Sequence, residues 1–214
     1  VKCRIAQLRG ETCGPVAPYA NAEALKAALT EELAQVDASG DRALVIGALG
    51  RVGRGASDLC AALGIPVTGW DMAETAHGGP FPEILDHAYF FNCILAGPDT
   101  PAFIRPDAPQ AERALRVIGD IACDPDSAFN PVQVYDRATT WAEPALRVHD
   151  APPLESWPST TCHPCCRAKA QRISRASCCR PYRRCQRRIM PSGNVREICS
   201  LSMSPRSDLQ EKNR

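Results

Sequence analysis

The sequence has no long apolar run and no recognisable targeting segment at its start. Its longest uncharged apolar stretches, residues 43–50 and 88–98, fall well short of the roughly 20 residues that a membrane helix needs. The chain opens at Val1, and no basic stretch followed by an apolar one comes after it. We therefore expect a cytoplasmic protein without a membrane partner, whose sequence is cut at its front.

The composition is that of a globular protein. Hydrophobic residues make up 44% of the 214 positions and charged residues 23%, which excludes disorder throughout, collagen and coiled coil. A chain of this length predicts one or two domains.

Acidic residues are scarce in the last part of the chain, and this scarcity divides the sequence in two. Residues 1–155 hold 12 Lys and Arg against 21 Asp and Glu, a charge of −9, whereas residues 156–214 hold 13 against 3, a charge of +10. Seven of the 12 cysteines also lie in the basic part. The formal net charge of +1 therefore averages two unlike segments and indicates no partner.

The beginning of the acidic part predicts a loop followed by a helix. Residues 1–18 are punctuated by Gly and Pro and are expected to be irregular. Asn21 is a good N-cap, and leucines recur every four residues over 22–34. This spacing predicts an amphipathic helix over 22–34.

Residues 42–71 have the order of strand, glycine turn, helix, strand and terminal acid that a dinucleotide-binding motif requires. The first strand, 42–46, is a continuous apolar run typical of a parallel strand buried on both faces. A helix is expected over 56–63 and a second strand over 65–70.

The glycines of this turn suit a pyrophosphate. Gly47 allows a sharp turn, Gly50 lets the backbone approach the phosphates, and Gly53 lets the helix pack close to the sheet. Asp71 ends the second strand, where a carboxylate can accept both ribose hydroxyls of an adenosine and would repel a 2′-phosphate, which favours NAD over NADP. The spacing is G-x-x-G-x-x-G rather than G-x-G-x-x-G, so two plainer interpretations stay open: glycines that serve only a tight turn, and Asp71 as a solvated strand end.

The pattern of strands continues beyond this motif. Further strands are expected over 88–95 and 117–122, with a helix over 111–117 between them. These elements predict an α/β fold with a Rossmann-like, doubly wound parallel sheet and a largely irregular C-terminal tail. Ligands of such sheets gather at the carboxyl ends of the strands.

Several short blocks of the acidic part resemble the NAD-binding domain of saccharopine dehydrogenase of the L-lysine-forming type, whose sheet is shared with alanine dehydrogenase. The resemblance covers about residues 14–155. The matching blocks are residues 44–53, 70–71, 74–75, 78–81, 92–94, 120–124, 129–131 and 148–153.

The resemblance implies NAD-dependent oxidative cleavage of saccharopine to L-lysine and 2-oxoglutarate, a step of lysine metabolism. It implies pyrophosphate contacts from Gly50 and Arg51 and a ribose contact from Asp71. Together with the glycine pattern, the expected cofactor-binding set is Gly47, Gly50, Arg51, Gly53, Asp71, Thr75, Leu95 and Ile121. The expected substrate-binding set, which faces the substrate and the nicotinamide, is Ala122, Cys123 and Asp124.

Proton transfer in that family is carried by a Lys and a His of an N-terminal domain. That domain would precede Gly14, so we assign no catalytic residue here and interpret residues 1–15 as its remnant. Residues 16–155 are then the NAD-binding domain. We expect a monomeric, truncated remnant that retains this domain but lacks turnover, because catalysis needs both walls of the cleft to position the reactants.

Residues 156–214 form a Cys- and Arg-rich tail with two interpretations. Cys162, His163, Cys165 and Cys166 are spaced like a small zinc site, and the neighbouring Arg pairs suit nucleic acid, which gives an alternative function as a zinc- or nucleic-acid-binding or nucleotide-sensing protein. The second interpretation is a slipped reading frame. Cys codons read one base earlier encode Leu, Met or Val, and most Arg codons then encode Ser, Pro, Thr or Ala.

The letters of the tail favour the slipped frame. When the reading frame is shifted back by one base, the codons of residues 157–167 are compatible with Met-Ala-Ile-Asp-Asn-Leu-Pro-Ser-Met-Leu-Pro. This peptide resembles the segment after the Ala-Pro-Pro block in saccharopine dehydrogenases. We therefore expect residues 156–214 to be frame-shifted and disordered. We expect neither a metal nor a nucleic-acid partner.

Overall fold

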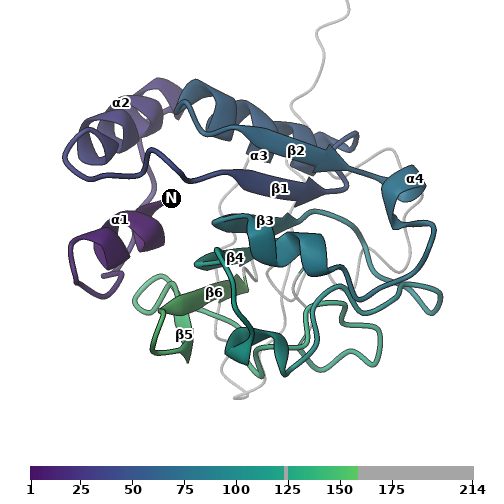
Figure 1. The fold of residues 1–214 in the computed structure, drawn as a ribbon. Helices are drawn as coiled ribbons and strands as arrows, with labels where there is room; N and C mark the ends of the chain where they lie inside the picture. The colour runs from purple at the N-terminus through teal and green to yellow at the C-terminus, as the bar shows by residue number, and fades with distance from the viewer. Residues whose placement is uncertain (123–124, 159–214) are drawn as a thin grey trace, which may run out of the picture. The chain divides into compact units, whose positions relative to one another are not determined.

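The computed structural model describes residues 1–122 and 125–158 of the chain. Short helices and four- or five-residue strands alternate along most of its length (Figure 1). In chain order the elements are α1 (Lys2–Leu8), α2 (Ala22–Leu33), β1 (Ala43–Ile46), α3 (Arg51–Ala62), β2 (Val67–Trp70), α4 (Met72–Thr75), the 3-10 helix η1 (Pro82–Asp86), β3 (Tyr89–Asn92), the 3-10 helix η2 (Ala108–Gln110), β4 (Val117–Asp120), β5 (Leu146–His149) and β6 (Leu154–Pro158).

The strands form one six-stranded sheet in the order β2-β1-β3-β4-β6-β5. All neighbouring strands pair in parallel except β5 and β6, which are antiparallel. The chain passes from β1 to β2 on one side and then to β3 on the other side of β1, so the strand order reverses between β1 and β3. This is the Rossmann-like α/β architecture that the sequence predicts, and the reversal marks the point where such sheets bind ligands.

The central strand β1 is buried on both faces, as its apolar run predicts. Leu44 and Ile46 point to one face, where they join a core with Phe81 and Ile84 from the region of η1. Ala43 points to the other face and packs in a cluster with Cys60 of α3. Because side chains alternate along a strand, the sheet has two hydrophobic cores, one on each of its faces.

The first helices lie at the amino-terminal ends of the strands, opposite α4 (Figure 1). The prediction for α2 is confirmed, because the Asn21 side chain accepts a hydrogen bond from Ala24 N at 2.8 Å. The prediction that residues 1–18 are irregular is wrong for residues 2–8 and holds for residues 9–18, which lie outside the helices and strands. Residues 2–8 form α1, which is too short for a repeating apolar pattern and is fixed instead by buried Cys3 and Ile5.

Two further sequence predictions need correction. The helix after the glycine turn begins at Arg51 rather than at residue 56. Its first turns have no apolar period to predict them, because Arg51, Val52 and Arg54 are exposed and the buried position, Gly53, has no side chain. The predicted helix over 111–117 does not form, and residues 111–116 run without helix into β4. Buried Arg113 donates to the carbonyls of Pro109, Leu115 and Pro152, which stabilises the non-helical path.

Strands β5 and β6 have no counterpart among the sequence predictions. Strand β6 runs through position 156, where the composition changes, and Ser156 is fully buried in it. The rest of the tail, residues 159–214, lies outside the described residues, together with its Cys/His pattern, its proposed disorder and its proposed frame slip.

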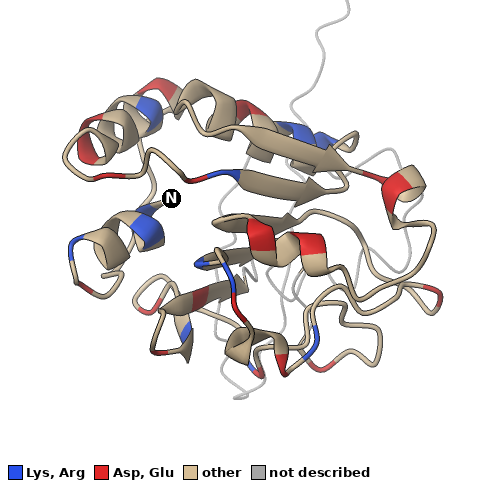
Figure 2. Cartoon of the chain, in the orientation of Figure 1, with Lys and Arg blue, Asp and Glu red and all other residues tan. Residues whose placement is uncertain are grey.

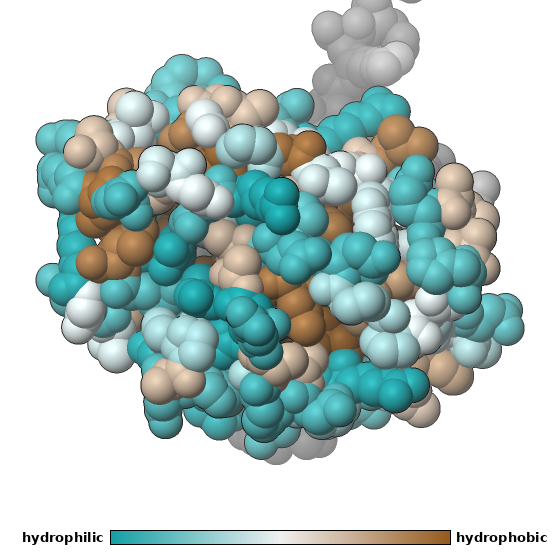
Figure 3. All heavy atoms as spheres, viewed as in Figure 1, coloured by the Kyte–Doolittle hydropathy of each residue, from teal (hydrophilic) through white to brown (hydrophobic). Residues whose placement is uncertain are grey.

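Polar and charged groups are spread over the described surface. Acidic positions occur on α2, α4 and η1, and basic ones on α1 and α3 (Figure 2). The face shown in Figure 3 is mainly hydrophilic, with apolar residues in separate patches. Among the described helices, none combines the length and apolarity that crossing a membrane would require.

Candidate functional site

The glycine turn leaves β1 at the edge where the parallel strands end. Gly47 has a positive φ of 86°, a backbone conformation that residues other than glycine rarely adopt. The backbone N–H groups of Gly47 and Ala48 both donate to Trp70 O, at 2.9 and 3.0 Å, so the turn is bonded to the end of β2. A Cβ on Gly47 would lie 2.9 Å from Ile94 Cγ2, which shows how closely the segment after β3 approaches.

The start of α3 packs against this turn without room for a side chain. A Cβ on Gly53 would lie 2.1 Å from Gly47 O, and one on Gly50 would lie 3.2 Å from the same oxygen. Gly50 is the N-cap of α3 and offers no side-chain hydrogen bond to it. Gly50 and Arg51 are exposed. The helix therefore presents its first N–H groups and positive dipole end to solvent, a geometry that suits an anion such as a pyrophosphate.

Asp71 lies at the end of β2 and is tied to the same turn. Its Oδ2 accepts a hydrogen bond from Leu49 N and its Oδ1 from Met72 N, both at 3.0 Å. Asp71 N donates to Glu74 Oε2 at 2.7 Å, and Thr75 Oγ1 donates to Asp71 O at 2.9 Å. Each carboxylate oxygen can accept more than one hydrogen bond, so both retain capacity for a ribose hydroxyl.

The remaining predicted cofactor residues come from the ends of β3 and β4. Leu95 follows β3 and is 94% exposed, and Ile121 follows β4 and is 37% exposed. Leu49, in the glycine turn, is 70% exposed. The structure thus brings the predicted cofactor set to the carboxyl ends of four adjacent strands, β2, β1, β3 and β4, and to the helices that directly follow β1 and β2.

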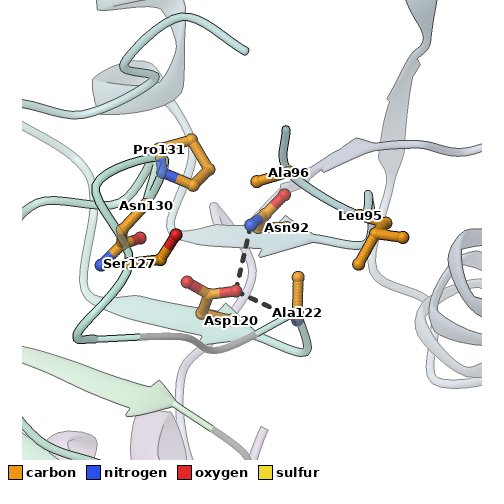
Figure 4. Close-up of a pocket in the computed structure, with 8 residues that line it drawn as sticks. All are labelled: Asn92, Leu95, Ala96, Asp120, Ala122, Ser127, Asn130 and Pro131. Carbon is orange, nitrogen blue, oxygen red and sulfur yellow. Dashed lines mark hydrogen bonds between the residues drawn. The ribbon is translucent and has the colours of Figure 1, made fainter. Parts of the chain in front are cut away.

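A small pocket of about 60 Å³ opens between the ends of β3 and β4 (Figure 4). Ala122, one of the predicted substrate residues, lines it, whereas Cys123 and Asp124 lie outside the described residues. Asn92 and Asp120 also line this pocket; both lie in the matching blocks 92–94 and 120–124, but neither is in the expected cofactor- or substrate-binding set. The available signal was that each is a polar residue directly ending an apolar strand.

Known proteins are similar in sequence to this chain over about two thirds of its length. Three curated saccharopine dehydrogenases, NAD(+)-dependent and L-lysine-forming, are similar to it: those of Candida albicans (43% identical over 147 residues), Neurospora crassa (42% over 149) and Yarrowia lipolytica (43% over 140). Over its N-terminal two thirds, this chain is homologous to saccharopine dehydrogenase. No family model matches the chain.

The homology to saccharopine dehydrogenase covers part of each protein. The aligned regions take in 65%, 65% and 62% of this chain and 38%, 40% and 38% of the three relatives. The chain thus spans about two fifths of the length of the curated saccharopine dehydrogenases that it matches.

Proposed function

We propose that this chain carries the NAD-binding portion of a saccharopine dehydrogenase and holds the dinucleotide along the carboxyl edge of its sheet. The observation that carries the proposal is the close packing of Gly53, in the first turn of α3, against Gly47 in the glycine turn. A Cβ on Gly53 would lie 2.1 Å from Gly47 O, so only glycine fits at position 53. A turn that binds no ligand would not need the helix to pack this closely. It is the close packing that brings the N-terminus of a helix up to a phosphate group.

Different residues of the chain would contact different parts of the dinucleotide. Backbone N–H groups after Gly50, with the Arg51 guanidinium, would hold the pyrophosphate. Asp71 would accept the adenosine ribose hydroxyls and exclude a 2′-phosphate by charge repulsion. Thr75, Leu95 and Ile121 would flank the cofactor. NAD, when bound, supplies the hydride acceptor.

The homology extends the proposal to the reaction of the relatives. We propose that the substrate is saccharopine, cleaved to L-lysine and 2-oxoglutarate, and that Ala122 faces it from the pocket beside β4. Cys123 and Asp124, which follow Ala122, keep their proposed substrate role. No proton-transfer residue is assigned.

Calorimetric titration with NAD tests the proposed cofactor site. We expect saturable binding to the full chain and a loss of about ten- to hundredfold in affinity in Asp71→Ala, because a hydrogen bond to a charged group is worth about 1.5–3 kcal/mol. Asp58→Ala is the matched control, since it removes an exposed carboxylate of α3 away from the turn. Absent NAD binding, or equal affinities in the two variants, would reject the proposal.

A further inference from the structure

Asn92 and Asp120 form a buried polar pair beside the glycine turn. They are register partners and the last residues of β3 and β4, and their exposed fractions are 0% and 1%. Asn92 Nδ2 donates to Asp120 Oδ1 at 3.0 Å. Asp120 also accepts from Ala122 N at 3.2 Å and from Tyr135 OH at 2.5 Å. Two strands of the sheet therefore end in a polar network that is held from several directions.

The network fixes the orientation of the Asn92 amide. A carboxylate accepts hydrogen bonds and donates none, so the NH₂ group of Asn92 has to face Asp120. The amide oxygen is then directed to the opposite side, toward Ala96 (Figure 4). Asn92 Oδ1 is fully buried and accepts no hydrogen bond from any part of the chain that the structure describes. Buried acceptors in native proteins are nearly always paired, so this atom calls for a donor.

The pocket beside Asn92 has room for a small terminal group and not for a ring system. Its volume is about 60 Å³, and polar groups of Asp120, Ser127 and Asn130 line it with Asn92. Leu95, in the predicted cofactor set, forms part of its wall. Because β3 adjoins β1, the pocket lies next to the glycine turn, on the side away from Asp71.

We propose that Asn92 Oδ1 accepts a hydrogen bond from a nitrogen of the bound ligand, and that Asp120 is a positioning residue that acts through Asn92. This inference rests on the proposed NAD site. A dinucleotide whose ribose is at Asp71 on β2 and whose pyrophosphate crosses β1 continues toward β3. The donor is therefore either the carboxamide of its nicotinamide or a primary amine of a substrate beside it, and both have the N–H chemistry that an amide oxygen recognises.

Titrations with NAD, two of its analogues and L-lysine separate these two cases. NAD carries the carboxamide NH₂, the 3-acetylpyridine analogue of NAD replaces that NH₂ by a methyl group, and ADP-ribose lacks the ring. Each is titrated into the full chain and into Asn92→Ala. L-Lysine is then titrated into both proteins with NAD present. Gln110→Ala is the matched control, because it removes an exposed side-chain amide at the end of η2 that does not line the pocket.

The carboxamide case predicts that the unaltered chain binds NAD about tenfold more tightly than the acetylpyridine analogue. That ratio falls toward one in Asn92→Ala and persists in Gln110→Ala, while ADP-ribose binds all three proteins equally. The amine case predicts equal binding of NAD and its analogue, and L-lysine binding that Asn92→Ala abolishes.

Two results would count against the inference, and they are distinguishable. If ADP-ribose binds but the unaltered chain neither prefers NAD to its analogue nor binds L-lysine, the role of Asn92 is wrong while the NAD site stands. If ADP-ribose does not bind, the proposed function fails, and the inference fails with it. The comparison of ligands on the unaltered chain stays decisive even where Asn92→Ala does not fold.

Discussion

The carboxylate of Asp71 and the backbone N–H of Leu49 form a hydrogen bond of 3.0 Å that joins the end of β2 to the glycine turn after β1. The acid that would select the ribose is thus positioned by the turn that would bind the pyrophosphate. Asp71→Asn removes the charge of this side chain, whereas Asp71→Ala removes both of its oxygens. The two variants therefore test different functions of Asp71.

Asp71→Asn is expected to relax the choice between NAD and NADP. Asn keeps one oxygen for the Leu49 N–H, but its NH₂ group then faces Met72 N in place of Oδ1, so the free energy of unfolding should fall by about 1 kcal/mol. The negative charge that repels a 2′-phosphate is lost, so the affinity ratio of NAD to NADP should fall by about tenfold or more. Calorimetry with both dinucleotides measures the ratio. Glu74→Gln is the control, and an unchanged ratio in Asp71→Asn would contradict the assigned role.

Two glycines of α3 are expected to respond oppositely to the same substitution. Gly53→Ala places a Cβ within 2.1 Å of Gly47 O, a backbone atom, and should destabilise the fold by about 3 kcal/mol or more. Gly55→Ala meets nothing within 4 Å and should stabilise it by about 0.5–1 kcal/mol, because alanine is the better helix former. Urea unfolding of the two variants measures the difference. Equal effects would show that the turn and helix are not closely packed.

Several features of the fold could be predicted because their sequence signals are local. The apolar run of β1, the N-cap at Asn21 and the sharp turn at Gly47 each depend on a few neighbouring residues. Asp71 is found in the same way, since it directly ends a strand.

Other features depend on contacts between distant residues and had no local signal. Helix α1 is stabilised by a pairing of Arg4 with Asp41, 37 positions away. The stretch after η2 is kept out of a helix by Arg113, which binds the carbonyl of Pro152. The pocket at Asn92 requires knowing that β3 and β4 are neighbours in register. Such features follow from the fold rather than from sequence periodicity.

Arg4→Ala is expected to release α1 from the rest of the fold. Arg4 Nε and Nη2 lie 2.8 and 3.0 Å from the two carboxylate oxygens of Asp41, and the two side chains are only 16% and 7% exposed. Removing the arginine leaves a buried carboxylate without its partner, which costs about 3 kcal/mol. Urea unfolding gives the loss, and hydrogen exchange should show faster exchange in residues 2–8.

Arg9→Ala is the control for this prediction. The Arg9 side chain is exposed and, among the described residues, hydrogen-bonds only Gln35, so its loss should cost less than about 0.5 kcal/mol. If both variants lose the same stability, the Arg4 and Asp41 pair does not hold α1.

Glu155 of β6 is expected to make stability depend on pH. Its side chain is 3% exposed, and burial raises the pKa of its carboxyl, with the opposing charge of Arg147 lowering it in part. The folded chain therefore keeps this proton at pH values where the unfolded chain has released it. Between the ordinary glutamate pKa and the raised one, the contribution of Glu155 to the free energy of unfolding falls as the pH rises.

Glu155→Gln removes this titration and isolates its effect. Gln can still accept the hydrogen bond that Arg147 Nη2 gives to Oε1 at 3.0 Å. Relative to the unaltered chain, the variant should therefore gain stability as the pH rises from about 4 toward neutrality, with a plateau above the raised pKa. Urea unfolding across this range measures the difference. Glu143→Gln, at an exposed carboxyl, should show no such trend, and a pH-independent difference for Glu155→Gln would show that burial in β6 does not hold the proton.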